Sequence, residues 1–217
     1  MTFAEMKEET FRRLREVSSA PVFFSEADVE EALNAGYAEL SDASEWYEVS
    51  QNIDILEDRP YYDLRRVLGA AFLAVGPGFD TQTSQWLLPT VTKQFDAHDR
   101  RWERVVGEPQ RLIIKGLWWL GYWPRFGADS GTIKQYYTAL PPVLAEDDDE
   151  PGFPENFHDG CIEFALADLW AQDAETTRAL LAWAQYLETE AALSEWVSER
   201  GSGPTLHGFD ILGGSAR

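Results

Sequence analysis

The sequence predicts an α+β protein, in which a helical bundle carries an inserted small antiparallel β-sheet or sandwich. Apolar residues recur at helical spacing near both ends of the chain, whereas they alternate with a period of two in the middle. A change from strand to helix within residues 132–160 separates the two patterns. We expect a helical bundle formed by residues 1–58 and 141–203, a β-rich lobe over residues 59–140 and an extended C-terminal tail over residues 204–217.

The N-terminal part predicts two helices and one strand. Residues 3–17 carry acidic side chains early and arginines late, which suits the helix dipole. Ser25 followed by Asp28 resembles a capping box, and the second helix is therefore expected from Glu26 to about Leu40. Residues 46–54 alternate loosely, which indicates a strand or an edge segment.

The middle of the chain predicts four or five strands joined by turns. A helical turn is expected within residues 92–106, and Gly76-Pro77-Gly78 is expected to form a plain turn. The expected strands cover residues 64–75, 84–89, 111–119, 119–125 and 132–139.

Two helices are expected after the last strand. Pro141 and Pro142 end the strand because proline cannot donate a ladder hydrogen bond. The acidic turn, residues 147–150, fits the N-terminal side of the helix that Pro154 starts. This third helix ends near Gln172 and a fourth covers residues 174–199. The fourth helix is expected to face the core with an apolar stripe that comprises Leu180, Trp183 or Ala184, Leu187, Ala191 and Val197.

Charge is the most unusual feature of the composition. The chain has 38 acidic and 18 basic residues, with a formal net charge of −20. This balance argues against binding of nucleic acid through a broad basic face, since phosphate contacts need clustered Lys and Arg. The acidity fits either a solvated acidic surface or a functional negative field.

The sequence carries no catalytic or metal-binding motif, and we expect neither an enzyme nor a cofactor. Cys161 is the single cysteine and is expected to be a buried small hydrophobe. His98 with Asp96 and Asp99 resembles an acid/base trio, but neighbouring residues on a helical turn diverge. The acidic turn lacks an EF-hand pattern, which favours a solvated turn over a cation site.

A cluster of aromatic residues is the main candidate for a contact surface. Strand alternation places Trp118 and Tyr122 on one parity and Trp119 and Trp123 on the other. One parity is expected to be core, and the other predicts a surface that faces a partner protein or stacks on a sugar or base.

The order of these signals resembles the head-tail connector, or adaptor, proteins of tailed phages and related viruses. The resemblance covers residues 25–195 and rests on EEALNAGYAEL, YYDLRRVLGAAF, RRWERVVGEPQRLIIKGLWWLGYWP and the block GTIKQYYTALPPVLAEDDDEPGFPENFHDGCIEFALADLWAQD. In that family, a strand with a proline after it leads through acidic residues into two long helices. The aromatic WWLGYWPRF segment departs from the family's apolar and proline pattern.

The resemblance implies a structural virion protein of the head-tail junction, assembled in the host cytoplasm. Such proteins form a homo-oligomeric ring, usually of twelve copies, between the portal protein and the tail or next connector protein. Genomic DNA would pass through the lumen without specific binding, and no membrane would be involved. On this picture the C-terminal tail is a portal-docking arm with four apolar anchors: Leu206, Phe209, Ile211 and Leu212.

Two other classes of function remain open from the residues. An acidic DNA mimic that inhibits a nucleic-acid-binding enzyme would be a monomer or dimer, with carboxylates at phosphate spacing. A carbohydrate-binding module would stack glycans on the aromatic segment Trp118–Trp123.

Overall fold

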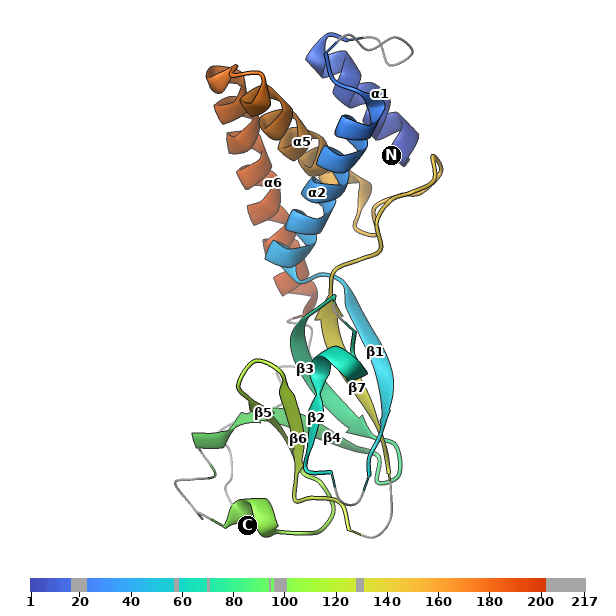
Figure 1. Cartoon of the computed structure of the whole chain (residues 1–217), viewed down its shortest axis with the longest axis vertical. Helices are drawn as coiled ribbons and strands as arrows, with labels where there is room; N and C mark the ends of the chain where they lie inside the picture. The colour runs from blue at the N-terminus through green and yellow to red at the C-terminus, as the bar shows by residue number, and fades with distance from the viewer. Residues whose placement is uncertain are drawn as a thin grey trace. The chain divides into compact units, whose positions relative to one another are not determined.

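The computed structural model describes residues 1–16, 23–56, 59–69, 71–93, 95, 101–127 and 131–201. The predicted α+β class is confirmed, because a seven-stranded sheet is inserted between N-terminal and C-terminal helices (Figure 1). The chain forms two compact units. The helical unit comprises Met1–Trp46 and Pro141–Arg217, and the sheet unit comprises Tyr47–Leu140.

Two capping boxes begin the N-terminal helices of the helical unit. Helix α1 (Phe3–Leu14) starts after Thr2, and α2 (Glu26–Ser44) starts after Ser25. The amide of Asp28 donates to Ser25 Oγ at 3.2 Å, and the amide of Ser25 donates to the Asp28 carboxylate at 2.8 Å, which confirms the predicted box.

Helix α2 continues one turn beyond its predicted end. The hydroxyls of Ser41 and Ser44 are buried and donate to the carbonyls of Tyr37 and Leu40, at 2.7 and 2.5 Å. Back-bonding to the preceding turn satisfies these polar side chains inside the helix, so serine does not end it.

Helix α5 (His158–Gln172) is packed between α2 and α6 (Thr176–Gly201) and follows the 3-10 turn η2 (Glu155–Phe157) (Figure 1). Two glycines allow the close approach of these helices. A β-carbon at Gly36 would lie 2.9 Å from the Cys161 carbonyl oxygen, and one at Gly160 would lie 2.8 Å from Thr189 Cγ2. The core between the helices includes Cys161, as predicted for a buried hydrophobe.

The sheet unit has more strands than the four or five expected. Its strand order is β1-β7-β3-β4-β5-β6-β2, and all neighbouring pairs are antiparallel except β4 and β5. The strands are β1 Glu48–Asp54, β2 Tyr61–Asp63, β3 Phe72–Asp80, β4 Gln85–Val91, β5 Arg111–Lys115, β6 Trp119–Trp123 and β7 Thr132–Ala139. The bounds of β7 agree with the prediction.

The predicted strand over residues 64–75 is wrong before Phe72. Asp63 accepts a hydrogen bond from the amide of Arg65 and caps a short helix, α3 (Leu64–Val67). The strand β3 begins only at Phe72. Local capping chemistry overrides the β-compatible composition of this stretch.

The predicted plain turn at Gly76-Pro77-Gly78 is also wrong, because these residues lie inside β3. The register with β7 shifts between Val75 and Gly78, as at a β-bulge. The buried side-chain amide of Gln135 donates to the carbonyls of Gly76 and Pro77, at 2.8 and 3.2 Å. A side chain of β7 therefore replaces the ladder bonds lost at the bulge.

The predicted helical turn in residues 92–106 is confirmed in the described residues, because residues 92, 93 and 95 are α-helical and Trp102–Arg104 form the 3-10 helix η1. The core of the sheet unit includes four aliphatic side chains that are each less than 2% exposed, namely Leu87, Leu112, Leu120 and Ile133.

Candidate interaction surfaces

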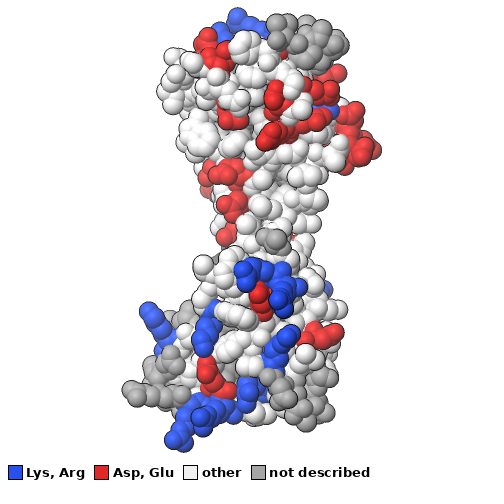
Figure 2. All heavy atoms as spheres, in the orientation of Figure 1, with Lys and Arg blue, Asp and Glu red and all other residues white. Residues whose placement is uncertain are grey.

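The two units differ sharply in charge. The sheet unit has eleven acidic and eleven basic residues, whereas the helical unit has the other 27 acidic and seven basic residues. The whole formal charge of −20 therefore belongs to the helical unit. Figure 2 shows this difference, with Asp and Glu prevalent on the helical unit and Lys and Arg on the sheet unit.

The apolar stripe predicted to face the core on α6 instead lies largely at the surface. Leu180, Trp183 and Leu187 are 64%, 40% and 45% exposed. The helix packs on its neighbours through a different set of side chains, which comprises Ala182, Tyr186 and Leu193. Both sets have helical spacing, so periodicity alone did not distinguish the buried face from the exposed one.

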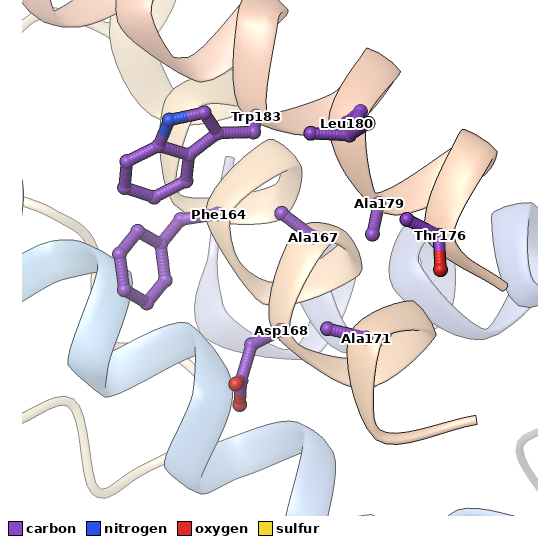
Figure 3. A pocket seen from close by; sticks show the side chains of 8 residues that line it. All are labelled: Phe164, Ala167, Asp168, Ala171, Thr176, Ala179, Leu180 and Trp183. Atoms are coloured by element: carbon purple, nitrogen blue, oxygen red, sulfur yellow. The ribbon is translucent and has the colours of Figure 1, made fainter. Parts of the chain in front are cut away.

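The exposed stripe borders a pocket of about 390 Å³ between α5 and α6 (Figure 3). The rings of Phe164, Trp183 and Tyr186 pack together at its edge, with centroids 5.0–5.9 Å apart. The rest of the lining is mainly apolar, with Ala167, Ala171 and Ala179 beside the polar Asp168 and Thr176. We name Leu180, Trp183 and Leu187 the outer stripe of α6.

The aromatic residues predicted to face a partner are divided between surface and core. Trp118 and Trp119 are 41% and 48% exposed, next to Leu117 at 78%, where the turn after β5 leads into β6. Trp118 packs against Phe72, with Arg65 over its ring at 5.0 Å. These contacts fix the orientation of one indole at the surface.

Tyr122 and Trp123 do not lie on that exposed corner. Tyr122 is 5% exposed, and burial raises the pKa of its hydroxyl. The indole of Trp123 is half-buried and donates to the Trp102 carbonyl at 3.0 Å. Both side chains contribute to packing within the sheet unit. Strand parity does not predict the exposure of Trp118, because this residue precedes β6.

The acidic turn contacts α1 rather than the start of α5. The amides of Phe3 and Ala4 donate to the carbonyls of Asp149 and Asp147, at 2.7 and 3.1 Å. The Asp149 carboxylate accepts from two amides of its own turn, which lowers its pKa. The prediction placed the carboxylates of this turn at the start of the helix after Pro154, whereas the contacts observed are made by backbone carbonyls at the start of α1, where the first amides of a helix lack partners within it.

Lys7 joins the acidic turn to α2. Its ammonium contacts Glu26, Glu30 and Asp147 at 3.0, 2.8 and 2.9 Å. Burial alone would lower the pKa of Lys7, yet the hydrogen bonds with these carboxylates raise it overall. The pairs link three segments of the helical unit.

Two side chains with reactive groups, Cys161 and His158, are buried within the helical unit. Burial raises the pKa of the Cys161 thiol, and His158 is buried with Nε2 2.9 Å from the Phe153 carbonyl. Asp96, His98 and Asp99 lie outside the described residues, as do Leu206, Phe209, Ile211 and Leu212. No group of three or more His, Cys, Asp or Glu with metal-site geometry occurs in the described part of the chain.

Comparison with known protein families shows the family to which this chain belongs. The model of the SU10 adaptor protein family matches residues 1–206, which is nearly the whole chain. The chain belongs to the SU10 adaptor protein family. This is a family of phage head-tail adaptors, so the resemblance found in the sequence is confirmed at the level of the family.

No curated protein matches this adaptor in sequence. Its described helices include none that is both long and apolar enough to cross a membrane. The sequence predicts that the outer stripe of α6 faces the core. A second apolar series on the same helix, Ala182-Tyr186-Leu193, is the signal that could have identified the buried face.

Proposed function

We propose that this phage adaptor forms a ring, of twelve copies, that joins the portal protein to the tail or to the next connector. The family match carries the proposal, since it covers both the helical and the sheet unit. In this role the protein is a structural part of the virion at the head-tail junction, and no step of its action is enzymatic.

Exposed apolar surface on the helical unit supports self-association. Leu180 and Leu181 are each 64% exposed, and Trp183 and Leu187 are 40% and 45% exposed, all on α6. Contiguous apolar patches on a protein surface mark places where a partner binds. In the ring, the helical units form the wall and these side chains are covered by protein.

The charge of the helical unit supports a conduit through which DNA passes without adhering. Twelve helical units would carry a formal charge of about −240, screened beyond a Debye length of ~8 Å at physiological ionic strength. A negative lumen repels the phosphate backbone. A ring whose inner face proved predominantly basic would contradict this part of the proposal.

Two further regions are proposed to meet partner proteins. The apolar anchors Leu206, Phe209, Ile211 and Leu212 of the C-terminal tail would dock on the portal. Trp118 and Trp119 of the sheet unit would contact a partner through their exposed indoles, since Trp is enriched at the centres of protein interfaces.

The deciding experiment is the molar mass of the purified protein, alone and mixed with its portal, measured by light scattering. The measurement is then repeated after deletion of residues 204–217 and for the Trp118→Ala and Trp119→Ala variants. A ring, or capture onto the portal that needs the tail, is the expected result.

A protein that stays monomeric and does not bind the portal would contradict both the ring and the portal contact. A ring that still binds the portal after the deletion would contradict only the docking role assigned to the tail. Unchanged partner binding by both tryptophan variants would contradict only the role of the exposed indoles.

A further inference from the structure

The outer face of α2 is acidic and carries no positive charge. Glu31, Glu39 and Asp42 are exposed at positions i, i+8 and i+11, with the small Ala35 between them. No Lys or Arg occurs in Glu26–Ser44. Glu31 and Asp42, which we name the acidic stripe, point away from the buried face of α2 formed by Leu33, Gly36, Tyr37 and Leu40. Glu39 lies toward α6, where burial and, in addition, the charge of Glu39 raise the pKa of Tyr186.

A groove on another part of the helical unit gathers most of its positive charge. It has a volume of about 770 Å³ and lies between α1, α5 and α6. Four of the seven basic residues of the unit line it, together with an apolar floor. The lining includes Arg12, Arg13, Arg15 and Arg178, the acidic Glu163 and Glu188, and the apolar Leu166, Trp170 and Leu181.

Two of the arginines in this groove are neutralised within the chain, and two are not. Arg12 and Arg13 both pair with Glu9, and Arg13 also pairs with Asp159 and Glu163. Among the described residues, no carboxylate lies within 4.0 Å of the guanidinium of Arg15 or Arg178. These two charges are available to a partner, and with the groove they form what we name the arginine groove.

The acidic stripe and the arginine groove lie on opposite sides of α5. Helix α2 packs against α5 where Gly36 meets Cys161. Trp170, in the floor of the groove, follows Cys161 by nine residues, which is two and a half turns of an α-helix. The side of α5 that carries the groove is therefore opposite the side that carries α2, and the acidic stripe points outward from α2.

We propose that the acidic stripe of one copy docks in the arginine groove of the next copy. Two different, complementary surfaces on opposite sides of one subunit make a head-to-tail contact, which generates a closed ring where the rotation between copies permits. Opposite charge favours this register over contacts between two acidic faces, which the −20 charge of the unit disfavours. The inference rests on the proposed ring and assigns the surfaces that build it.

Charge reversal on each surface tests the assignment. One variant combines Arg15→Glu with Arg178→Glu, the other combines Glu31→Arg with Asp42→Arg, and a third carries all four substitutions. Each of the first two is expected to weaken self-association at least about tenfold, because like charges then face each other. The third variant, and an equimolar mixture of the first two, are expected to assemble again, because opposite charges are restored.

Assembly is measured by sedimentation velocity for the free protein and by native mass spectrometry of copies bound per portal. The matched control is Arg104→Glu with Arg111→Glu, which changes the same charge at two exposed arginines of the sheet unit. The control should assemble like the unchanged protein. Circular dichroism of every variant verifies that the helices are intact.

The outcomes separate this inference from the proposed function. If the unchanged protein forms no ring, alone or on the portal, the proposed function fails and the inference fails with it. If it forms a ring and both reversal variants assemble equally well, only the assignment of the surfaces is overturned. If the variant with Arg15→Glu and Arg178→Glu self-associates normally but no longer binds the portal, the occupant of the groove is an acidic segment of the portal. This result also overturns the inference.

Discussion

Gly36 on α2 lies so close to Cys161 on α5 that a β-carbon at Gly36 would come within 2.9 Å of the Cys161 carbonyl oxygen. The second close atom is Phe164 Cβ, also at 2.9 Å. Neither neighbour is the far end of a flexible side chain, so the contact fixes the distance between the two helices. The same contact orients α5, with one side toward α2 and the other toward the arginine groove.

Replacement of Gly36 by alanine is expected to destabilise the helical unit by about 1–3 kcal/mol. Overpacking outweighs the roughly 1 kcal/mol that alanine contributes through helix propensity. Urea unfolding monitored by circular dichroism gives the change in free energy. Ala27→Leu, which adds bulk at an exposed position of α2, should change it by less than about 0.5 kcal/mol. Equal stability of Gly36→Ala and the unchanged protein would show that the helices separate without cost.

The thiol of Cys161 should react only when the helical unit opens. Its side chain is fully buried, which keeps the reagent away from the sulfur. Burial also raises the pKa of the thiol, which lowers the fraction of reactive thiolate. Labelling at pH 8 is expected to be at least about a thousandfold slower in the native protein than in urea. Addition of Ser198→Cys, at an exposed position of α6, supplies a second thiol that should label quickly. Rapid labelling of Cys161 itself would contradict its burial.

Gln135→Leu should destabilise the sheet unit by about 1–3 kcal/mol. The substitution leaves the carbonyls of Gly76 and Pro77 without the side-chain donor that reaches both across the bulge. Gln51 is the natural control, because it lies opposite Gln135 in the β1–β7 ladder and is exposed. Gln51→Leu should be nearly neutral. Denaturant unfolding followed by Trp fluorescence measures both, and a neutral Gln135→Leu would show that the bulge does not depend on this amide.

Acid should weaken the helical unit partly through Glu9. Hydrogen bonds from Arg12 and Arg13 lower the pKa of Glu9 from 4.5 to about 2. A carboxylate with a lowered folded-state pKa stabilises the fold above its unfolded pKa, and the stabilisation disappears as pH falls from about 4.5 to about 2. Because Arg12 is largely exposed, we expect about 1–2 kcal/mol rather than the full shift.

The measurement for Glu9 is a comparison with Glu9→Gln. The unfolding free energies of the two proteins should differ at pH 7 and converge near pH 2. Glu8→Gln, at an exposed neighbouring position of α1, should show little difference at either pH. A constant difference across this range would contradict the role of the two arginines.

Much of the fold could be predicted because its signals are local. The capping box at Ser25 and the prolines after Ala139 fix element ends through hydrogen bonds made or lost within a few residues. The family resemblance likewise rested on short motifs in a fixed order, and it is confirmed by the family match.

The wrong predictions concern residues whose structure depends on contacts with residues that are distant in the sequence. Gly76-Pro77-Gly78 has the composition of a turn, but Gln135 on β7 provides the hydrogen bonds that keep it in a strand. Tyr122 and Trp118 share a parity in the sequence, yet only Tyr122 is buried in the core of the sheet unit, because Trp118 lies in the turn before β6.

The sequence by itself determined the helical and β-rich regions, the excess of negative charge and the family. Only the tertiary structure decided that the outer stripe of α6 is exposed, that the acidic turn meets α1, and that the acidic stripe and the arginine groove lie on opposite sides of α5. The physical reason is that periodicity gives each helix its faces but not their neighbours. Packing between elements distant in the chain selects which face is buried and which remains for a partner.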